Sequence, residues 1–429
     1  MKHLIILYSF LAFFIGIVEI SYGKDITDDT NILYISNAEE LKSFSNKVNA
    51  GDDFLGREVR LANDIFLNDT TGWKGWENHT SVELEQWIPI GNRKHSFKGT
   101  FNGQGHTIYG LYIHVGTEGF HQGLFGIVEE GKIKNTTVAA SFIKAYHYVG
   151  AVVGAIGYEN SELSNCHNTG VVIGERNHVG GVAGVAHGGT RVVDCSNTGI
   201  VKGKCDVGGI IGHYSTMGFF KGKYNGVAIY NCFNRGMVSG SQDVGGIIGV
   251  FKTLSIRRSV DTLANCYNIG EIVARLGAGG IVGYFYRNAR RKIYGSGNTL
   301  DKLTFSNCYS TGTIVDLYTQ ATDHLVGQYT TGQNWGENLD LATTIEENST
   351  ISYVKKAGFS LPKVRTLSQG MFSTANIRSP ESIKEMEEAD MRSPVFVDRL
   401  NETIQGDLQY KGWTLDTLGV NQGYPVFIE

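Results

Sequence analysis

The fold is decided by a pair of short motifs, Asp194-Cys195-Ser196-Asn197-Thr198-Gly199 followed by Val207-Gly208-Gly209-Ile210-Ile211-Gly212. The pair recurs along the middle of the chain, and its cysteines are Cys166, Cys195, Cys232, Cys266 and Cys308. The steps between these cysteines are 29, 37, 34 and 42 residues, and we interpret the longer steps as repeats with insertions, such as 213–227 and 287–302. Self-similarity at this period is typical of proteins built from stacked repeats.

Each repeat is too short and too rich in Gly for helices, so we expect two or three short strands with Gly and Asn at the corners. A single repeat cannot bury its own apolar face, so the repeats must stack. Stacking pairs each strand in parallel with its equivalent at about 4.8 Å. The sequence therefore predicts an all-β solenoid, a parallel β-helix, of about seven or eight coils between Trp87 and Gln328. A β-propeller, with blades of about 40–45 residues, is the alternative.

The composition agrees with many strands joined by tight corners, because 56 of 429 residues are Gly and only 5 are Pro. Collagen needs abundant Pro as well as Gly and is excluded. An apolar share of 41% argues against a disordered or linker-like chain. The net charge of −4 gives no electrostatic reason to expect nucleic acid or an anionic membrane surface as a partner.

The N-terminus carries the pattern of a secretory signal. A basic start at Lys2 precedes an apolar run over 4–18, and small residues stand at Ser21 and Gly23. We expect a signal peptide over 1–23; an uncleaved anchor is the alternative, although the run is shorter than the roughly 20 residues that span a bilayer. No second run of that length follows, so we expect a secreted or periplasmic protein without an integral membrane segment after signal removal.

We divide the rest of the chain into an N-terminal cap over 24–86, the repeat β-helix over 87–328, and C-terminal coils with a cap over 329–429. The first cap is expected to contain a strand over 32–35 and a helix that stops at Gly51, because Ser36 and Asn37 precede Glu39 and Glu40 in a capping-box pattern. The mixed C-terminal cap is expected to hold short helices starting near Ser382 and Ser393, with Trp413 and Tyr424 closing that end.

The repeat also resembles a known family. The pattern Asn-Cys-x-Asn-x-Gly followed by Val-Gly-Gly-Ile-(Ile/Val)-Gly is similar to the GLUG motif of bacterial secreted and surface proteins, and Gly123-Leu124-Phe125-Gly126 fits the same proteins. The resemblance implies a right-handed β-helix. It implies little about activity, because this repeat occurs in adhesin-like proteins and beside metallopeptidase domains.

Equivalent residues of stacked coils should form columns. The five repeat cysteines are expected to be a column of buried thiols, because in-register Cβ atoms lie about 4.8 Å apart, wider than the usual 3.5–4.5 Å of a disulfide. Some pairing stays open, and Cys205 stands outside the column. The absence of a Cys-x-x-Cys pair argues against a metal site, and we expect no cofactor. Asn168, Asn197, Asn234 and Asn268, ending at Ser310, should form a hydrogen-bonded stack.

Two weak candidate sites remain. Asp206 and Asp243 both precede Val-Gly-Gly and should lie on neighbouring coils as an acid/base pair or Ca²⁺ ligands, although His178 holds the same place one coil earlier and solvated turn residues are the simpler interpretation. Trp73 and Trp76 could stack on a sugar, although packing against the cap explains them equally. The motifs of zinc peptidases, serine hydrolases and P-loop proteins are missing from the sequence.

Our leading hypothesis is therefore a secreted, adhesin-like β-helix that binds an extracellular glycan or a host or cell-surface protein without catalysis. The alternative is a carbohydrate-active β-helix enzyme, a polysaccharide lyase or glycoside hydrolase, that uses scattered acidic residues such as Asp206 and Asp243. We expect the distinction to depend on whether these carboxylates and a basic residue converge.

Overall fold

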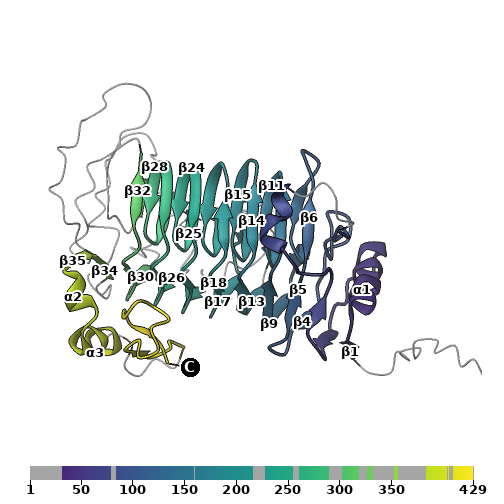
Figure 1. Cartoon of the computed structure of the whole chain (residues 1–429), viewed down its shortest axis with the longest axis horizontal. Helices are drawn as coiled ribbons and strands as arrows, with labels where there is room; N and C mark the ends of the chain where they lie inside the picture. The colour runs from purple at the N-terminus through teal and green to yellow at the C-terminus, as the bar shows by residue number, and fades with distance from the viewer. Residues whose placement is uncertain are drawn as a thin grey trace, which may run out of the picture.

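A computed structural model describes residues 31–78, 84–158, 160–215, 228–254, 260–288, 302–317, 326–331, 352–355, 383–402, 404 and 409–428. The described strands stack in parallel into a rod with three long sheets (Figure 1). The predicted parallel β-helix is therefore confirmed, and the propeller alternative is excluded because equivalent strands of successive repeats pair directly. The predicted signal peptide, 1–23, lies outside the described residues.

The first sheet contains one or two short strands from each coil. Its members are β1 (Ile32–Ile35), β2 (Glu58–Leu61), β3 (Ile65–Phe66), β4 (Thr100–Asn102), β5 (Thr107–Tyr109), β9 (Lys132–Ala139), β13 (Glu162–Asn168), β17 (Arg191–Val193), β18 (Ser196–Asn197), β22 (Ala228–Tyr230), β23 (Phe233–Asn234), β26 (Val260–Ala264), β27 (Tyr267–Asn268), β30 (Lys302–Ser306), β31 (Tyr309–Ser310), β34 (Ser352–Lys355) and β35 (Ile383–Met386).

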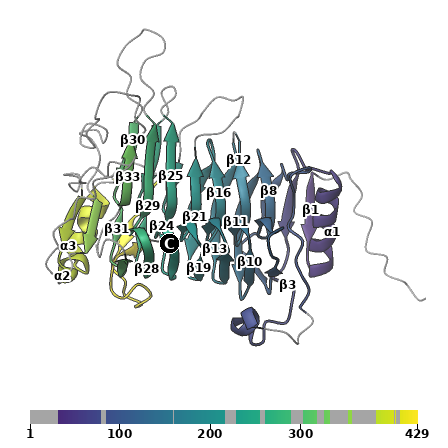
Figure 2. The same cartoon turned by 90° about the horizontal axis from the view of Figure 1, so that it is seen from above.

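The second sheet is built of β6 (Tyr112–His114), β7 (Phe120–Gln122), β10 (Phe142–Ala145), β11 (His147–Gly150), β14 (Val171–Gly174), β15 (Asn177–Gly180), β19 (Ile200–Lys202), β20 (Cys205–Gly208), β24 (Val238–Gly245), β28 (Ile272–Gly279) and β32 (Ile314–Asp316). The third sheet has one strand per coil and seven in all (Figure 2): β8 (Phe125–Glu129), β12 (Val153–Gly157), β16 (Ala183–His187), β21 (Ile211–Ser215), β25 (Ile248–Leu254), β29 (Val282–Asn288) and β33 (Val326–Thr331). Inward-facing aliphatic side chains of all three sheets meet in one continuous core.

The asparagine column is confirmed as a buried hydrogen-bonded ladder. Asn168 Nδ2 donates to Asn197 Oδ1 at 2.8 Å, and Asn197 Nδ2 donates to Asn234 Oδ1 at 2.7 Å. The ladder continues to Asn268 at 2.8 Å and ends at the hydroxyl of Ser310 at 3.2 Å. Each amide donates a hydrogen bond to the amide of the next coil, so the buried ladder helps to set the register of the first sheet.

A second asparagine ladder runs along the corner just before the cysteines, where the sequence did not single it out. Asn135 Nδ2 donates to Asn102 Oδ1 at 3.0 Å, and Asn165 repeats the contact with Asn135 at 3.0 Å. The pattern resumes further along the rod from Asn265 to Asn231 and from Asn307 to Asn265, both at 2.7 Å. All of these residues except Asn102 have left-handed backbones, which Asn tolerates better than most residues.

The five repeat cysteines form the predicted column of buried free thiols, and Cys205 is a half-buried free thiol outside it. Each column thiol donates to a nearby backbone carbonyl, as Cys195 does to the carbonyl of Val193 at 3.3 Å. Burial raises the pKa of the Cys166, Cys232 and Cys266 thiols well above the ordinary value. The column therefore acts as small apolar packing.

The N-terminal cap has the predicted form. Helix α1 (Ala38–Ala50) lies across the first coil (Figure 1), Asn37 Oδ1 accepts from the Glu40 backbone N–H at 3.0 Å, and Gly51 ends the helix at φ 120°. Phe44 on α1 meets Phe54, Phe97 and Phe101 in the core. The helix thus covers an apolar coil end that would otherwise expose the interior of the rod.

The C-terminal cap differs from the prediction in two ways. Residues 383–386 form strand β35, paired with β34, and the helix expected near Ser382 starts later as α2 (Glu388–Met391). The helix expected near Ser393 is confirmed as α3 (Pro394–Glu402). A capping pattern alone could not distinguish a strand from a helix at 383–386, because the pairing partner β34 comes from a distant part of the chain.

The last described segment, 409–428, lies along the flank of the rod beside the first sheet instead of only closing its end (Figure 1). It contains the antiparallel pair β36 (Trp413–Thr414) and β37 (Val426–Phe427). Trp413 Nε1 donates to Asn265 Oδ1 at 2.7 Å, and Trp413 also packs on the stacked rings of Tyr267 and Tyr309. The repeat corners thus supply both polar and aromatic anchors for this segment.

Candidate functional site

One corner of the rod, between the second and third sheets, carries the residues with the clearest chemistry. In five successive coils the residue before the Val-Gly or Gln-Gly of the corner has a left-handed backbone with φ between 55° and 63°, and these residues are His121, Tyr148, His178, Asp206 and Asp243. We call this set the corner column. All five side chains are half-buried. Most non-glycine residues avoid this conformation, so the shape of the corner is imposed by the coil that surrounds it.

A glycine three residues after the Gly-Gly pair, such as Gly212 after Gly208-Gly209, allows the corner to pack closely against the neighbouring coil. A Cβ atom at Gly212 would lie 2.3 Å from the backbone nitrogen of Val179 and 2.6 Å from the carbonyl carbon of His178. The corner backbone of one coil therefore rests directly on the third-sheet strand of the next coil, where only Gly fits. This close approach brings corner side chains against residues of the third sheet.

The main contact of this kind joins His178, Asp206 and His213. His213 Nδ1 hydrogen-bonds Asp206 Oδ2 at 2.9 Å. His178 Nδ1 lies 2.8 Å from the same oxygen, but the geometry does not form a hydrogen bond, and this nitrogen has no other hydrogen-bond partner. The side chains are 19%, 13% and 16% exposed, respectively. Two imidazoles thus converge on one carboxylate from two adjacent coils.

The cluster has marked electrostatic effects. Burial alone would raise the pKa of Asp206, but its contacts with His178 and His213 outweigh burial and hold that pKa well below the ordinary value. Burial, followed by the charge of Asp206, raises the pKa of Asp243 to about 7. Burial lowers the pKa of His213 although Asp206 opposes the shift. At neutral pH the carboxylate of Asp206 is the fixed negative charge of the corner.

The rest of the corner column continues as stacked rings. His121 and Tyr148 stack at 4.6 Å and 1°, and Tyr148 stacks on His178 at 4.9 Å and 27°. Beside them, Phe120 stacks on His147 at 5.5 Å and 19°. Parallel in-register stacking places equivalent rings face to face.

The sequence correctly placed Asp206 and Asp243 on neighbouring coils, since β20 and β24 pair with Val207 opposite Val244. It missed the histidines. The repeat pattern gives His178 only as the residue that stands in place of aspartate one coil earlier, and it places His213 in the insertion 213–227. The available signal was that His213 directly follows Gly212, at the position of Val185 and Val250 in adjacent coils.

The two tryptophans have different surroundings. Trp76, in the short 3₁₀ helix η1 (Trp73–Asn78), is 1% exposed and packs edge-on against Tyr112 at 5.7 Å. Its ring is therefore not open to a sugar, because the loop folds onto the second sheet and buries it beside Phe142. Trp73 is half-buried in the same cluster, and a ligand contact for it stays a prediction.

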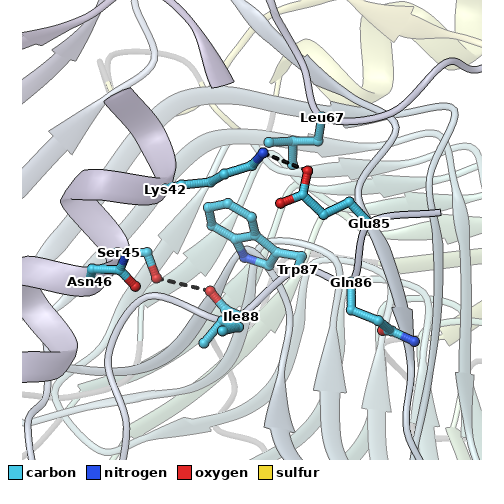
Figure 3. Close-up of a pocket in the computed structure, with 8 residues that line it drawn as sticks. All are labelled: Lys42, Ser45, Asn46, Leu67, Glu85, Gln86, Trp87 and Ile88. Carbon is cyan, nitrogen blue, oxygen red and sulfur yellow. Dashed lines mark hydrogen bonds and ion pairs between the residues drawn. The ribbon is translucent and has the colours of Figure 1, made fainter. Parts of the chain in front are cut away.

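Two cavities lie away from the corner column. One of about 150 Å³ separates α1 from the segment 84–88 and is bordered by Lys42, Trp87 and Ile88 (Figure 3). Its walls are fixed by the Lys42–Glu85 ion pair at 2.5 Å and by the Trp87 indole, which donates to the Leu124 carbonyl. This volume is below the 300–1,000 Å³ of typical small-molecule sites. The other cavity, about 390 Å³, lies between the rod and the C-terminal segment beside Arg235 and Tyr424.

Among groups that could hold a cation in the described part of the chain, His178, Asp206 and His213 offer three ligand atoms within 4.8 Å of one another. The sequence argument against a metal considered the repeat cysteines, and these five are buried in the core column. Imidazole and carboxylate together suit Zn²⁺ and related ions. The structure thus groups potential ligands that are spread over 35 positions of the chain.

Comparisons with known proteins add little about activity. No family model matches the chain, so the GLUG resemblance stays an interpretation of the motif. A protein of Evansella cellulosilytica named "Putative Gly-rich membrane protein" is 38% identical over 72 residues, which cover 16% of this chain and 8% of that protein. The chain therefore matches only a small part of that relative.

A solved structure of a "putative immunoglobulin A1 protease" from Bacteroides ovatus aligns with a TM-score of 0.49 and 16% identity, covering 92% of this chain and 91% of the other. We base no functional argument on this likeness. In the described part of the present chain, every helix is too short or too polar to span a membrane.

Proposed function

We propose that this β-helix is a secreted binding protein that holds an extended, anionic glycan along the outer face of its second sheet, without catalysis. The observation that carries the proposal is a set of side-chain columns on the second sheet, at the turn between the two strands that these coils contribute to it. In one of these columns the ring of Tyr146 is followed on the next two coils by the cations Arg176 and Lys204, and beside it the rings of Phe120 and His147 stack. A straight, periodic surface of this kind fits a polymer better than a compact small molecule.

The composition of the columns supports this ligand class. Phe120 is 36% exposed and Tyr146 is half-buried, so both present apolar ring surface to solvent. Arg176 and Lys204 follow Tyr146 at the equivalent position of the next two coils and are exposed. Aromatic rings can pack on sugar rings, while exposed cations attract carboxylate or sulfate groups. The secretory N-terminus and the GLUG-like repeat are further support for a role at the cell exterior.

The test is binding of the whole mature chain to an array of acidic and neutral glycans, with matrix proteins as a second arm. We expect binding to acidic glycans that weakens as salt rises, because exposed charges are screened. Tyr146→Ala and Arg176→Ala should each weaken binding about tenfold, equivalent to 1.4 kcal/mol. Lys132→Ala is the matched control, since Lys132 is an exposed cation on the first sheet. Equal loss in the control, or no glycan binding, would refute the proposal.

One observation favours a second candidate, a carbohydrate-active enzyme. Asp206 and Asp243 lie side by side in register, and the basic side chains of His178 and His213 approach Asp206. Paired carboxylates are the usual groups for cleaving glycosidic bonds. Incubation of the chain with acidic and neutral polysaccharides decides between the two: a product that disappears in Asp243→Asn favours the enzyme, and the absence of any product rejects it.

A further inference from the structure

We propose that His178, Asp206 and His213 form a binding site for one divalent transition-metal ion of the Zn²⁺ type. The site goes beyond glycan binding and does not depend on it. His178 comes from the corner of one coil and Asp206 from the equivalent corner of the next coil, while His213 belongs to the third-sheet strand β21, which rests on the corner of His178. The rigid stacking of the coils therefore fixes their relative positions.

The geometry is close to that of a metal-ligand set. Nδ1 of His178 and Nδ1 of His213 lie 2.8 Å and 2.9 Å from Asp206 Oδ2. A tetrahedral ion at about 2.0–2.1 Å from each ligand would hold neighbouring ligand atoms about 3.3 Å apart. Rotations that move each side chain by about half an ångström open that space, without a change of backbone.

The hydrogen bonding of the cluster is incomplete in a way that a metal would correct. Asp206 Oδ2 receives one hydrogen bond of good geometry, from His213, while the buried Nδ1 of His178 lies 2.8 Å from the same oxygen without forming one. A buried nitrogen left in this state costs about 1–3 kcal/mol. An ion between the three side chains would accept both nitrogen lone pairs and the carboxylate at once.

The surroundings support a metal ligand set. Tyr148 stacks on one face of His178, and the edge of His213 approaches His178 at 4.7 Å and 83°, so both imidazoles are oriented by packing. Such support for ligand orientation strengthens metal binding. Two nitrogens and one oxygen favour Zn²⁺ over Ca²⁺ and Mg²⁺, which prefer oxygen ligands. Three protein ligands leave a further coordination position for water, as in catalytic zinc sites.

The repeat provides conservative variants for the test, because each ligand can be replaced by the residue at the equivalent position of a neighbouring coil. His213→Val copies Val185 and Val250, and His178→Tyr copies Tyr148. Asp206→Asn keeps size and tolerates the left-handed corner. His106→Ala is the control, since the His106 ring contacts one carboxylate, Asp64, at 3.3 Å without a second imidazole.

The experiment is calorimetric titration of Zn²⁺ into the whole mature chain, stripped with chelator and carried on a tag that lacks histidine. We expect one Zn²⁺ per chain, a rise in melting temperature with Zn²⁺ as binding to the native state requires, and no binding of Ca²⁺. His213→Val and Asp206→Asn should weaken Zn²⁺ binding at least tenfold, while His106→Ala and Cys205→Ser should match the parent. Melting without metal shows whether each variant folds, and His178→Tyr replaces any variant that does not.

Three results would overturn the proposal. The first is the absence of saturable Zn²⁺ binding by the folded parent, which would leave a hydrogen-bonded structural cluster. The second is unchanged affinity in folded His213→Val and Asp206→Asn. The third is loss of binding in Cys205→Ser, which would assign the ion to a thiolate instead. Failure of glycan binding would affect none of these readouts, so the two proposals are tested separately.

Discussion

Replacing Asn197 by Ala should remove one rung from the buried ladder of the first sheet. Asn197 is fully buried, and its side chain makes four hydrogen bonds. Nδ2 donates to Asn234 Oδ1 at 2.7 Å and to the Gly199 carbonyl at 3.1 Å. Oδ1 accepts from Asn168 Nδ2 at 2.8 Å and from the Gly199 N–H at 3.2 Å. The substitution therefore affects both the turn and the contacts to the two neighbouring coils.

The magnitude follows from what the substitution leaves unpaired. Asn234 Oδ1 still accepts from the Gly236 N–H at 3.2 Å and loses least. The Asn168 amide and the Gly199 N–H are left buried without the acceptor Asn197 Oδ1, and each such loss costs about 1–3 kcal/mol. We expect a total of about 4 kcal/mol, beyond the 0.5–3 kcal/mol of a typical substitution. Thr198→Ala, one residue away on an exposed side chain, should stay within about 0.5 kcal/mol of the parent.

Hydrogen exchange with mass spectrometry is the suitable assay, because repeat proteins can unfold locally and a single global transition is not assured. A loss of about 4 kcal/mol corresponds to about a thousandfold faster exchange in the coils that contain Asn168, Asn197 and Asn234. The effect should decline toward the N-terminal cap. If exchange in Asn197→Ala stays within tenfold of Thr198→Ala, the ladder does not stabilise the rod as we argue.

Three further predictions test other parts of the rod. Gly212→Ala should lower the melting temperature strongly, because the added Cβ would lie 2.3 Å from the Val179 nitrogen. Gly75→Ala is the control and should leave the melting temperature unchanged, since nothing lies within 4 Å of the added atom. Equal melting temperatures of the two variants would contradict the close approach at Gly212. Alkylation without reductant should label only Cys205 in the native chain and all six cysteines in denaturant; fewer labels in denaturant would reveal a disulfide. Trp413→Phe removes the N–H that bonds to Asn265, which should weaken docking of the C-terminal segment by about 1–2 kcal/mol. Proteolysis should therefore release this segment faster than in the parent. An unchanged rate would show that ring packing alone holds the segment.

The repeat made the architecture predictable because each coil places equivalent residues in register. Once Asn197 and Asn234 share a motif position, parallel stacking alone brings their amides together, and the cysteine column follows in the same way. The start and stop of α1 were also predictable, since the Asn37 cap and Gly51 are local signals. The strand at 383–386 was not, because its identity depends on pairing with β34 and not on its own residues.

The candidate site likewise contains one pair that follows from the repeat, Asp206 with Asp243, and one contact that does not, between the histidines and Asp206. The repeat alone predicts that Asp206 and Asp243 are neighbours, because both occupy one position of it. It also determined the rod, since Gly-Gly corners and apolar strands leave stacking as the only way to bury the interior. The meeting of His213 and His178 at Asp206 depends on the three-dimensional fold and does not follow from the repeat. That contact is made across a corner, between a turn of one sheet and a strand of another, and its distance depends on how closely Gly212 lets two backbones approach.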